Sequence, residues 1–150
     1  MNAKLTLLKK ATLSAVIGHG VALLFLFLSS AVLVKNENPS SMMPIAAIVA
    51  FFIGAAVCGV IAGRSGNGLW DVLAAGLVFS LLIIVISLLL NAVLPTVESE
   101  GDYGLGSKAA LIAGGLVVST LVGLWVSSRK NSGRTSVKRR KKALDKYINE

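Results

Sequence analysis

Four long apolar runs constrain the fold of this chain more than any other feature of its sequence. They lie at residues 13–34, 44–63, 72–94 and 109–128, and none has an Asp, Glu, Lys or Arg in its interior. A helix needs about 20 such residues to cross the roughly 30 Å of hydrocarbon in a bilayer. The sequence therefore predicts four transmembrane helices.

The composition places nearly the whole chain in a membrane. Only 15% of its residues are charged and its mean hydropathy is +0.79, whereas about 25% of the residues in a soluble domain are charged. The connections between the runs are short, so consecutive helices must be antiparallel neighbours. We predict an all-α fold in which residues 1–150 form one integral membrane domain, an antiparallel bundle of four transmembrane helices that ends in a basic tail at 129–150.

Basic residues gather at both ends of the chain. Three lysines precede the first run and nine Lys or Arg residues follow the last, whereas the connection before the fourth run carries Glu98, Glu100 and Asp102. Short cytoplasmic segments of membrane proteins carry an excess of Lys and Arg. We therefore expect both termini of this multi-pass protein to be cytoplasmic.

The tail contains five consecutive basic residues: Lys138, Arg139, Arg140, Lys141 and Lys142. A basic residue near an anionic membrane surface contributes about 1 kcal/mol of binding, so we expect these side chains to contact anionic lipid headgroups. A helix over this segment would place its apolar residues near one side, which suits a helix lying on a membrane surface. Nucleic acid is a less suitable partner, because Tyr147 is the only aromatic residue of the tail on which a base could stack.

Small residues recur at four-residue spacing in three of the runs. In lipid, helices associate through close packing at such residues, because lipid tails are as apolar as the side chains. The positions are Ala46, Ala50, Gly54, Cys58 and Ala62, with Ala55, Gly59 and Gly63 beside them, in the second run; Gly115, Ser119, Gly123 and Ser127 in the fourth; and Ser14, Gly18 and Ala22 in the first. We expect a tight bundle, in which one small face could also meet another subunit.

The third run carries a sparse polar stripe on an otherwise apolar helix. Gly76, Ser80, Ser87 and Asn91 lie within about 60° of one another at the helical angle of about 100° per residue. A lipid-facing Asn91 would leave polar groups without hydrogen-bond partners. We therefore expect the stripe to face the bundle.

The only histidine, His19, lies between two glycines at the predicted depth of three hydroxyl-bearing residues, Ser80, Ser119 and Thr120. We expect a neutral ring that forms a hydrogen bond with one of these hydroxyls. An ionisable group inside a membrane is a candidate functional site, and these four residues with Asn91 make up the predicted intramembrane polar cluster. The runs carry no acid and no second histidine to complete a catalytic or metal site. We therefore expect a packing role, with no catalytic residue, metal or cofactor.

The stretch "GVIAGRSGNGLWDVLAAGLVFSLLIIVISLLL", most sharply at residues 59–77, resembles a family of small four-span membrane proteins of Gram-positive bacteria, chiefly Clostridia. Members share a Gly-rich second span that ends in Ala-Gly-Arg, here Ala62, Gly63 and Arg64. A Gly-containing turn, a Gly- and Leu-rich third span and a basic tail follow. The resemblance implies a protein of the bacterial cytoplasmic (plasma) membrane, and it transfers no catalytic residue, because the family has no established activity.

Two functions from different classes follow from these observations. The first is an accessory, structural or assembly subunit that acts through helix packing and the basic tail, with membrane lipids, another membrane protein or a second copy of the chain as partners. The alternative is a small transporter or channel-forming oligomer in which the polar stripe of the third run lines the path. We favour the first.

Overall fold

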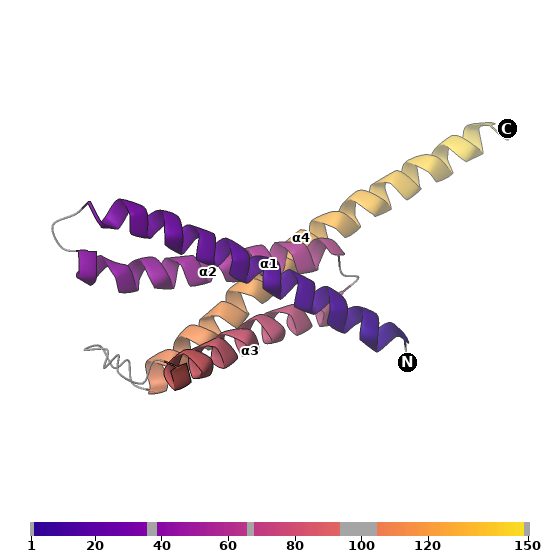
Figure 1. Cartoon of the computed structure of the whole chain (residues 1–150). Coiled ribbons are helices and arrows are strands. Elements are labelled where there is room, and N and C mark those ends of the chain that lie inside the picture. Colours follow the sequence, from indigo (N-terminus) through magenta and orange to yellow (C-terminus); the bar gives the residue numbers. More distant parts are fainter. Residues whose placement is uncertain (1, 36–38, 66–67, 94–104, 149–150) are drawn as a thin grey trace.

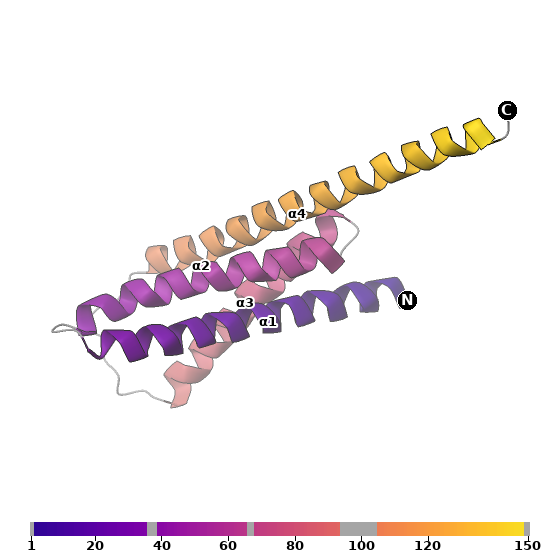
Figure 2. The same ribbon diagram turned by 90° about the horizontal axis from the view of Figure 1, so that it is seen from above.

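The computed structural model describes residues 2–35, 39–65, 68–93 and 105–148, and this part of the chain forms four α-helices (Figure 1). The helices are α1 (Asn2–Leu33), α2 (Pro39–Ser65), α3 (Leu69–Val93) and α4 (Leu105–Ile148). Consecutive helices run in opposite directions, as two perpendicular views show (Figures 1 and 2). The predicted all-α bundle of four helices is confirmed.

Each helix contains a segment long and apolar enough to cross a membrane. These segments are Leu5–Leu33, Ser41–Ser65, Leu69–Leu89 and Gly106–Lys130, with mean hydropathies of 2.2, 2.7, 3.0 and 2.1. They overlap all four predicted runs. The helices extend beyond the runs because Lys and Arg are good helix formers outside the hydrocarbon, so a charged residue ends an apolar run without ending the helix.

Helix α2 is the centre of the bundle. It packs against each of the other three helices, and α3 also packs against α1 and α4. Within the described part of the chain, α1 and α4 make no close backbone contact with each other. Side chains of α1 and α4 at equal depth are therefore separated by α2 and α3.

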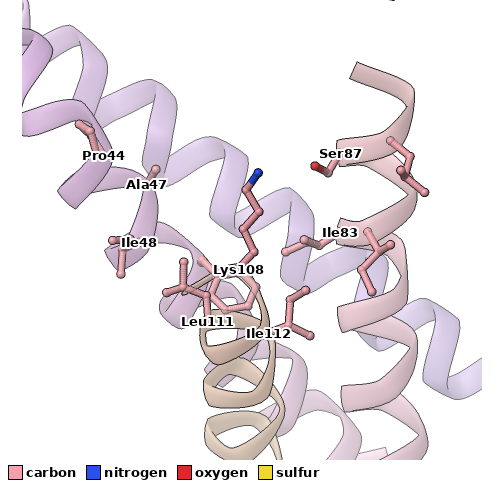
Figure 3. Close-up of a pocket in the computed structure, with 11 residues that line it drawn as sticks. Pro44, Ala47, Ile48, Ile83, Ser87, Lys108, Leu111 and Ile112 are labelled. Carbon is pink, nitrogen blue, oxygen red and sulfur yellow. The ribbon is translucent and has the colours of Figure 1, made fainter. Parts of the chain in front are cut away.

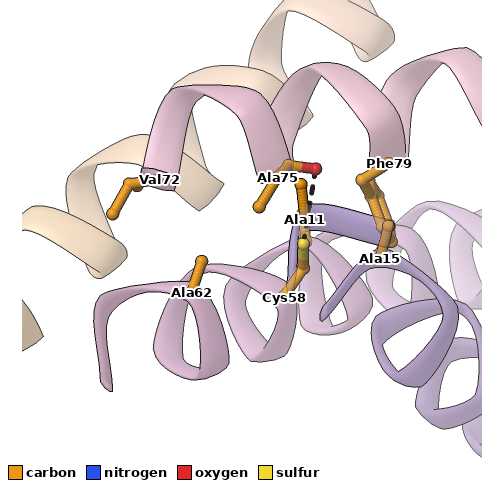
Figure 4. Close-up of a cluster of buried hydrophobic side chains, with 8 residues drawn as sticks. Ala11, Ala15, Cys58, Ala62, Val72, Ala75 and Phe79 are labelled. Atoms are coloured by element: carbon orange, nitrogen blue, oxygen red, sulfur yellow. Dashed lines mark hydrogen bonds between the residues drawn. The ribbon is translucent and has the colours of Figure 1, made fainter. Parts of the chain in front are cut away.

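The buried core lies in one half of the bundle, where α1 begins, α2 ends and α3 begins. Its members are small or flat side chains: Ala11, Ala15, Ala55, Cys58, Ala62, Val72, Ala75 and Phe79. Figure 4 shows them converging from α1, α2 and α3, with Phe79 beside Ala15. Most have small side chains, so the helix axes approach closely here and this half of the bundle is closed.

The helices spread apart toward the opposite end, where α3 ends and α4 begins (Figures 1 and 2). All the described side chains of α3 from Ile84 to Leu89 are exposed there. Grooves between the helices replace the closed core in this half.

Helix α4 is a single uninterrupted helix of 44 residues. Its last 18 residues, after Lys130, project beyond the other helices (Figures 1 and 2) and add about 27 Å of length at roughly 1.5 Å per residue. The tail is therefore helical, and its position relative to the membrane surface stays a prediction. No break after the span allows the helix to turn, so the tail continues in the direction of α4.

Candidate functional site

Two glycines bring α1 and α2 into backbone contact. A methyl group on Gly18 would lie 2.7 Å from the carbonyl oxygen of Gly54, and one on Gly54 would lie 2.7 Å from the carbonyl oxygen of Gly18. No glycine in the described residues has a positive φ, so small size, rather than conformational freedom, is what the packing uses. The predicted close approach at the small face of the second span is confirmed.

The second row of small residues on α2 meets a different helix, α4. A methyl group on Gly59 would overlap the carbonyl oxygen of Ser119, and one on Gly63 would overlap that of Gly123. The two rows of α2 thus contact α1 and α4 separately. Gly54, Gly59 and Gly63 are therefore all packed against other helices of the same chain.

His19 forms its hydrogen bond within its own helix. Its Nδ1 lies 2.8 Å from the carbonyl oxygen of Ala15, one turn earlier, and because a carbonyl only accepts, Nδ1 carries the proton in this contact. The ring is tilted against Phe79, with 4.2 Å between the ring centroids. The buried Nε2 has no hydrogen-bond partner. The predicted bond from His19 to a hydroxyl of α3 or α4 is therefore wrong.

The arrangement of the helices and the backbone explain this error. Ser119 and Thr120 lie on α4, which has no close backbone contact with α1, and Thr120 donates to the carbonyl oxygen of Leu116 at 2.7 Å. Ser14 similarly donates to the carbonyl oxygen of Lys10 at 2.9 Å. A carbonyl one turn earlier is always within reach of a short polar side chain on a helix, so local bonds replace the expected bonds between helices.

Two further residues of the predicted cluster, Ser80 and Ser119, are buried but unpaired. Ser80 and Ser119 are almost fully buried, and their hydroxyl oxygens have no hydrogen-bond partner. Ser119 lies near the Cys58 thiol, although that thiol donates instead to the carbonyl oxygen of Ala75 at 3.6 Å (Figure 4). Asn91 lies outside the described side chains. A function for the cluster stays a prediction.

The polar stripe of α3 has two different environments. Gly76 and Ser80 are buried, with Gly76 facing Ser119 of α4, as predicted. Ser87 also faces the other helices, but it is exposed because the helices have spread apart at its level.

Basic residues surround the carboxyl end of α2. Lys130 of α4 donates to the carbonyl oxygen of Arg64 at 2.7 Å, and Lys10 of α1 donates to that of Ser65 at 3.3 Å. The last carbonyls of a helix lack partners in that helix and attract cations. Arg129 lies over the ring of Trp125, 3.9 Å from its centroid. The sequence predicted basic residues at one end of the bundle, but not that two lysines cap α2.

A groove lies at the opposite end, between α2, α3 and α4. It has a volume of about 570 Å³ and is lined by Pro44, Ala47, Ile48, Phe51, Ile83, Ile84, Ser87, Leu88, Lys108, Leu111 and Ile112. Among the described residues that line it, Lys108 and Ser87 have polar side chains (Figure 3). Because these two residues are far apart in the sequence, periodicity within single helices could not reveal the groove.

A second groove of about 530 Å³ lies between α1 and α2 in the same half of the bundle, and Ser29 is the one polar residue among the described residues that line it. No group of three His, Cys, Asp or Glu side chains that could hold a metal ion occurs among the described residues. The side chains of Lys138, Arg139, Arg140, Lys141 and Lys142 lie outside the described residues.

The fold and the hydropathy of the helices support a general statement about this chain. Comparison with protein-family models, with curated proteins and with solved structures finds no match to this chain. Helix length and hydropathy support a membrane location, and the fold is a bundle closed at one end and open at the other. The chain is a four-span, all-α integral membrane protein.

Proposed function

We propose that the protein is an accessory subunit of the bacterial plasma membrane that holds a basic helix in a fixed direction relative to the bundle, on the cytoplasmic side. The observation that carries this proposal is the continuity of α4, which runs unbroken from Leu105 to Ile148. Gly59 and Gly63 of α2 hold its membrane-spanning part at backbone contact, and Lys130 joins it to the end of α2. The tail therefore extends from a firmly packed helix.

The distribution of charge supports the orientation. Lys10, Arg64 and Lys130 lie together at the closed end of the bundle, which the excess of Lys and Arg assigns to the cytoplasm. The choice of a bacterial membrane rests on the resemblance of residues 59–77 alone, because no family model matches the chain.

The reach of the tail favours a protein partner over lipid headgroups. Lys138 and Lys142 follow Lys130 by 8 and 12 residues, which places them about 12–18 Å farther along the helix. The headgroup region on one side of a bilayer is only about 5–8 Å thick. The five basic residues would then lie beyond most headgroups, within reach of an acidic surface on a partner.

The alternative, a small transporter or channel, has less support. It requires a polar path along α3, yet Gly76 and Ser80 are buried, and the core around Phe79 and Val72 fills the closed half of the bundle. The groove that contains Ser87 ends against Phe51 and Ile83.

Cross-linking in native membranes tests the proposal. Cells expressing the tagged full chain are cross-linked, the protein is purified in mild detergent, and attached proteins are identified by mass spectrometry. The test variant replaces five residues with glutamine, which preserves helix propensity: Lys138, Arg139, Arg140, Lys141 and Lys142. The matched control carries Lys4→Gln and Lys9→Gln, which remove basic residues from α1 at the same end of the bundle.

We expect one partner with the wild-type chain and the control, reduced at least about fivefold in the five-glutamine variant, since an exposed ion pair contributes about 0.2–1 kcal/mol. Equal recovery from all three chains would refute a role for the tail. If no protein is cross-linked to the chain and the purified chain supports solute flux in proteoliposomes, the transporter function replaces the accessory function.

A further inference from the structure

The groove between α2, α3 and α4 is the strongest candidate for a binding site outside the basic end. Nearly all of its lining is aliphatic or aromatic, and its two polar side chains, Lys108 and Ser87, approach it from different helices. Figure 3 shows the Lys108 chain extending into the groove and the Ser87 hydroxyl directed toward it from α3. An apolar recess with a cation and a hydroxyl is complementary to an amphiphile with an anionic head.

We propose that this groove binds one anionic glycerophospholipid, with an acyl chain along the apolar lining and the phosphate beside Lys108 and Ser87. Lys108 lies in the first turn of α4, which begins at Leu105. The first N–H groups of a helix have no acceptor within that helix and carry a partial positive charge. The start of α4 therefore adds to the attraction of the Lys108 ammonium for a phosphate.

The dimensions of the groove favour an acyl chain over a helix of another protein. Along α2 the lining extends from Pro44 to Phe51, a rise of about 10 Å, whereas a partner helix would cross about 30 Å of hydrocarbon. Phe51 also closes the groove toward the core, since its ring lies 5.7 Å from that of Phe79 and packs against Gly115. An acyl chain can end there, but a spanning helix cannot.

Charge is what would distinguish this lipid from its neighbours. Because any acyl chain is already in hydrocarbon, filling the groove gives little selectivity among lipids. The Lys108 ammonium acts at the headgroup, so it selects the anionic lipid. Under the proposed orientation the groove opens to the outer leaflet, opposite the basic end.

Native mass spectrometry of the full chain tests the assignment. The delipidated protein is mixed in detergent with equal amounts of phosphatidylglycerol and phosphatidylcholine that have the same acyl chains. The mass of the complex then identifies the lipid that the protein retains. We expect one phosphatidylglycerol per chain. Lys108→Gln should lower the preference for phosphatidylglycerol about fivefold, the effect of one cation at an anionic surface. Ala47→Phe should reduce retention of both lipids by filling the groove.

Lys35→Gln is the matched control, because Lys35 is an exposed cation at the same end of the bundle and does not line the groove. It should leave retention and preference unchanged. An equal loss of preference in Lys35→Gln and Lys108→Gln would refute the site, as would an unchanged preference in Lys108→Gln. Tighter retention of a long isoprenyl phosphate than of phosphatidylglycerol would overturn the choice of phospholipid. Size-exclusion profiles matching the wild type establish that each variant is folded.

Discussion

Replacing Gly59 with alanine would drive a methyl group into the backbone of α4. The new carbon would overlap the carbonyl oxygen of Ser119 and lie 3.1 Å from its carbonyl carbon and 3.2 Å from the nitrogen of Gly123. These atoms belong to a helical backbone, so they cannot rotate away as a side chain would. The helices α2 and α4 must separate instead, and a gap of about 0.5–1 Å already removes a quarter to a half of the dispersion energy of each contact.

Two opposing effects set the size of the change. Overpacking of this kind costs about 1–3 kcal/mol, whereas exchanging glycine for alanine inside a helix gains about 1 kcal/mol. Gly20→Ala isolates the second effect, because Gly20 lies in α1 with nothing within 4 Å of the added methyl group. We expect Gly59→Ala to be less stable than Gly20→Ala by about 1–3 kcal/mol, which is the overpacking cost alone.

Reversible unfolding by SDS in mixed micelles measures this difference, with tryptophan fluorescence reporting the folded fraction. The midpoint for Gly20→Ala should equal or exceed that of the wild type, and the midpoint for Gly59→Ala should fall below that of Gly20→Ala. Equal midpoints for the two variants would refute backbone contact between α2 and α4 at Gly59.

Three further predictions concern other parts of the bundle. His19→Phe keeps the ring against Phe79 and removes an unpaired buried nitrogen. We expect the free energy of unfolding to rise by up to about 1 kcal/mol, seen as a higher SDS midpoint. A clearly lower midpoint would indicate that Nε2 has a partner. The Cys58 thiol is fully buried, so maleimide should label it at least about tenfold more slowly in mild detergent than in SDS, because labelling requires local opening; equal rates would contradict the closed core. In a Cys58→Ser background, an impermeant maleimide should label Pro39→Cys on intact cells but Ser136→Cys only after the cells are opened, and the reverse pattern would invert the orientation.

The sequence predicted the helices well because each membrane-spanning helix must satisfy its own backbone hydrogen bonds and meet lipid along much of its length. That requirement is local, so the four apolar runs fall on the four observed spans. The ends of the helices were less predictable. Lys9 and Lys10 lie inside α1, because charged residues limit the apolar run and not the hydrogen-bonded helix.

The packing between helices could be predicted only in part. Spacing identified the small faces of α2, and Gly59 and Gly63 do make its closest contacts, but spacing does not say which neighbour each row meets. The His19 prediction failed for the same reason. Equal depth was treated as proximity, although α1 and α4 lie apart. The groove with Lys108 and Ser87 was missed because it requires the relative rotation of three helices.

The length of α4 couples the tail to the thickness of the bilayer. Its membrane-spanning segment, Gly106–Lys130, has 25 residues and a length of about 37 Å, which exceeds the roughly 30 Å of hydrocarbon. A helix that is too long for its bilayer tilts, and a thinner bilayer increases the tilt. Because the tail continues the same helix, a change in bilayer thickness alters the direction in which its basic residues point, without any ligand or rearrangement of the bundle.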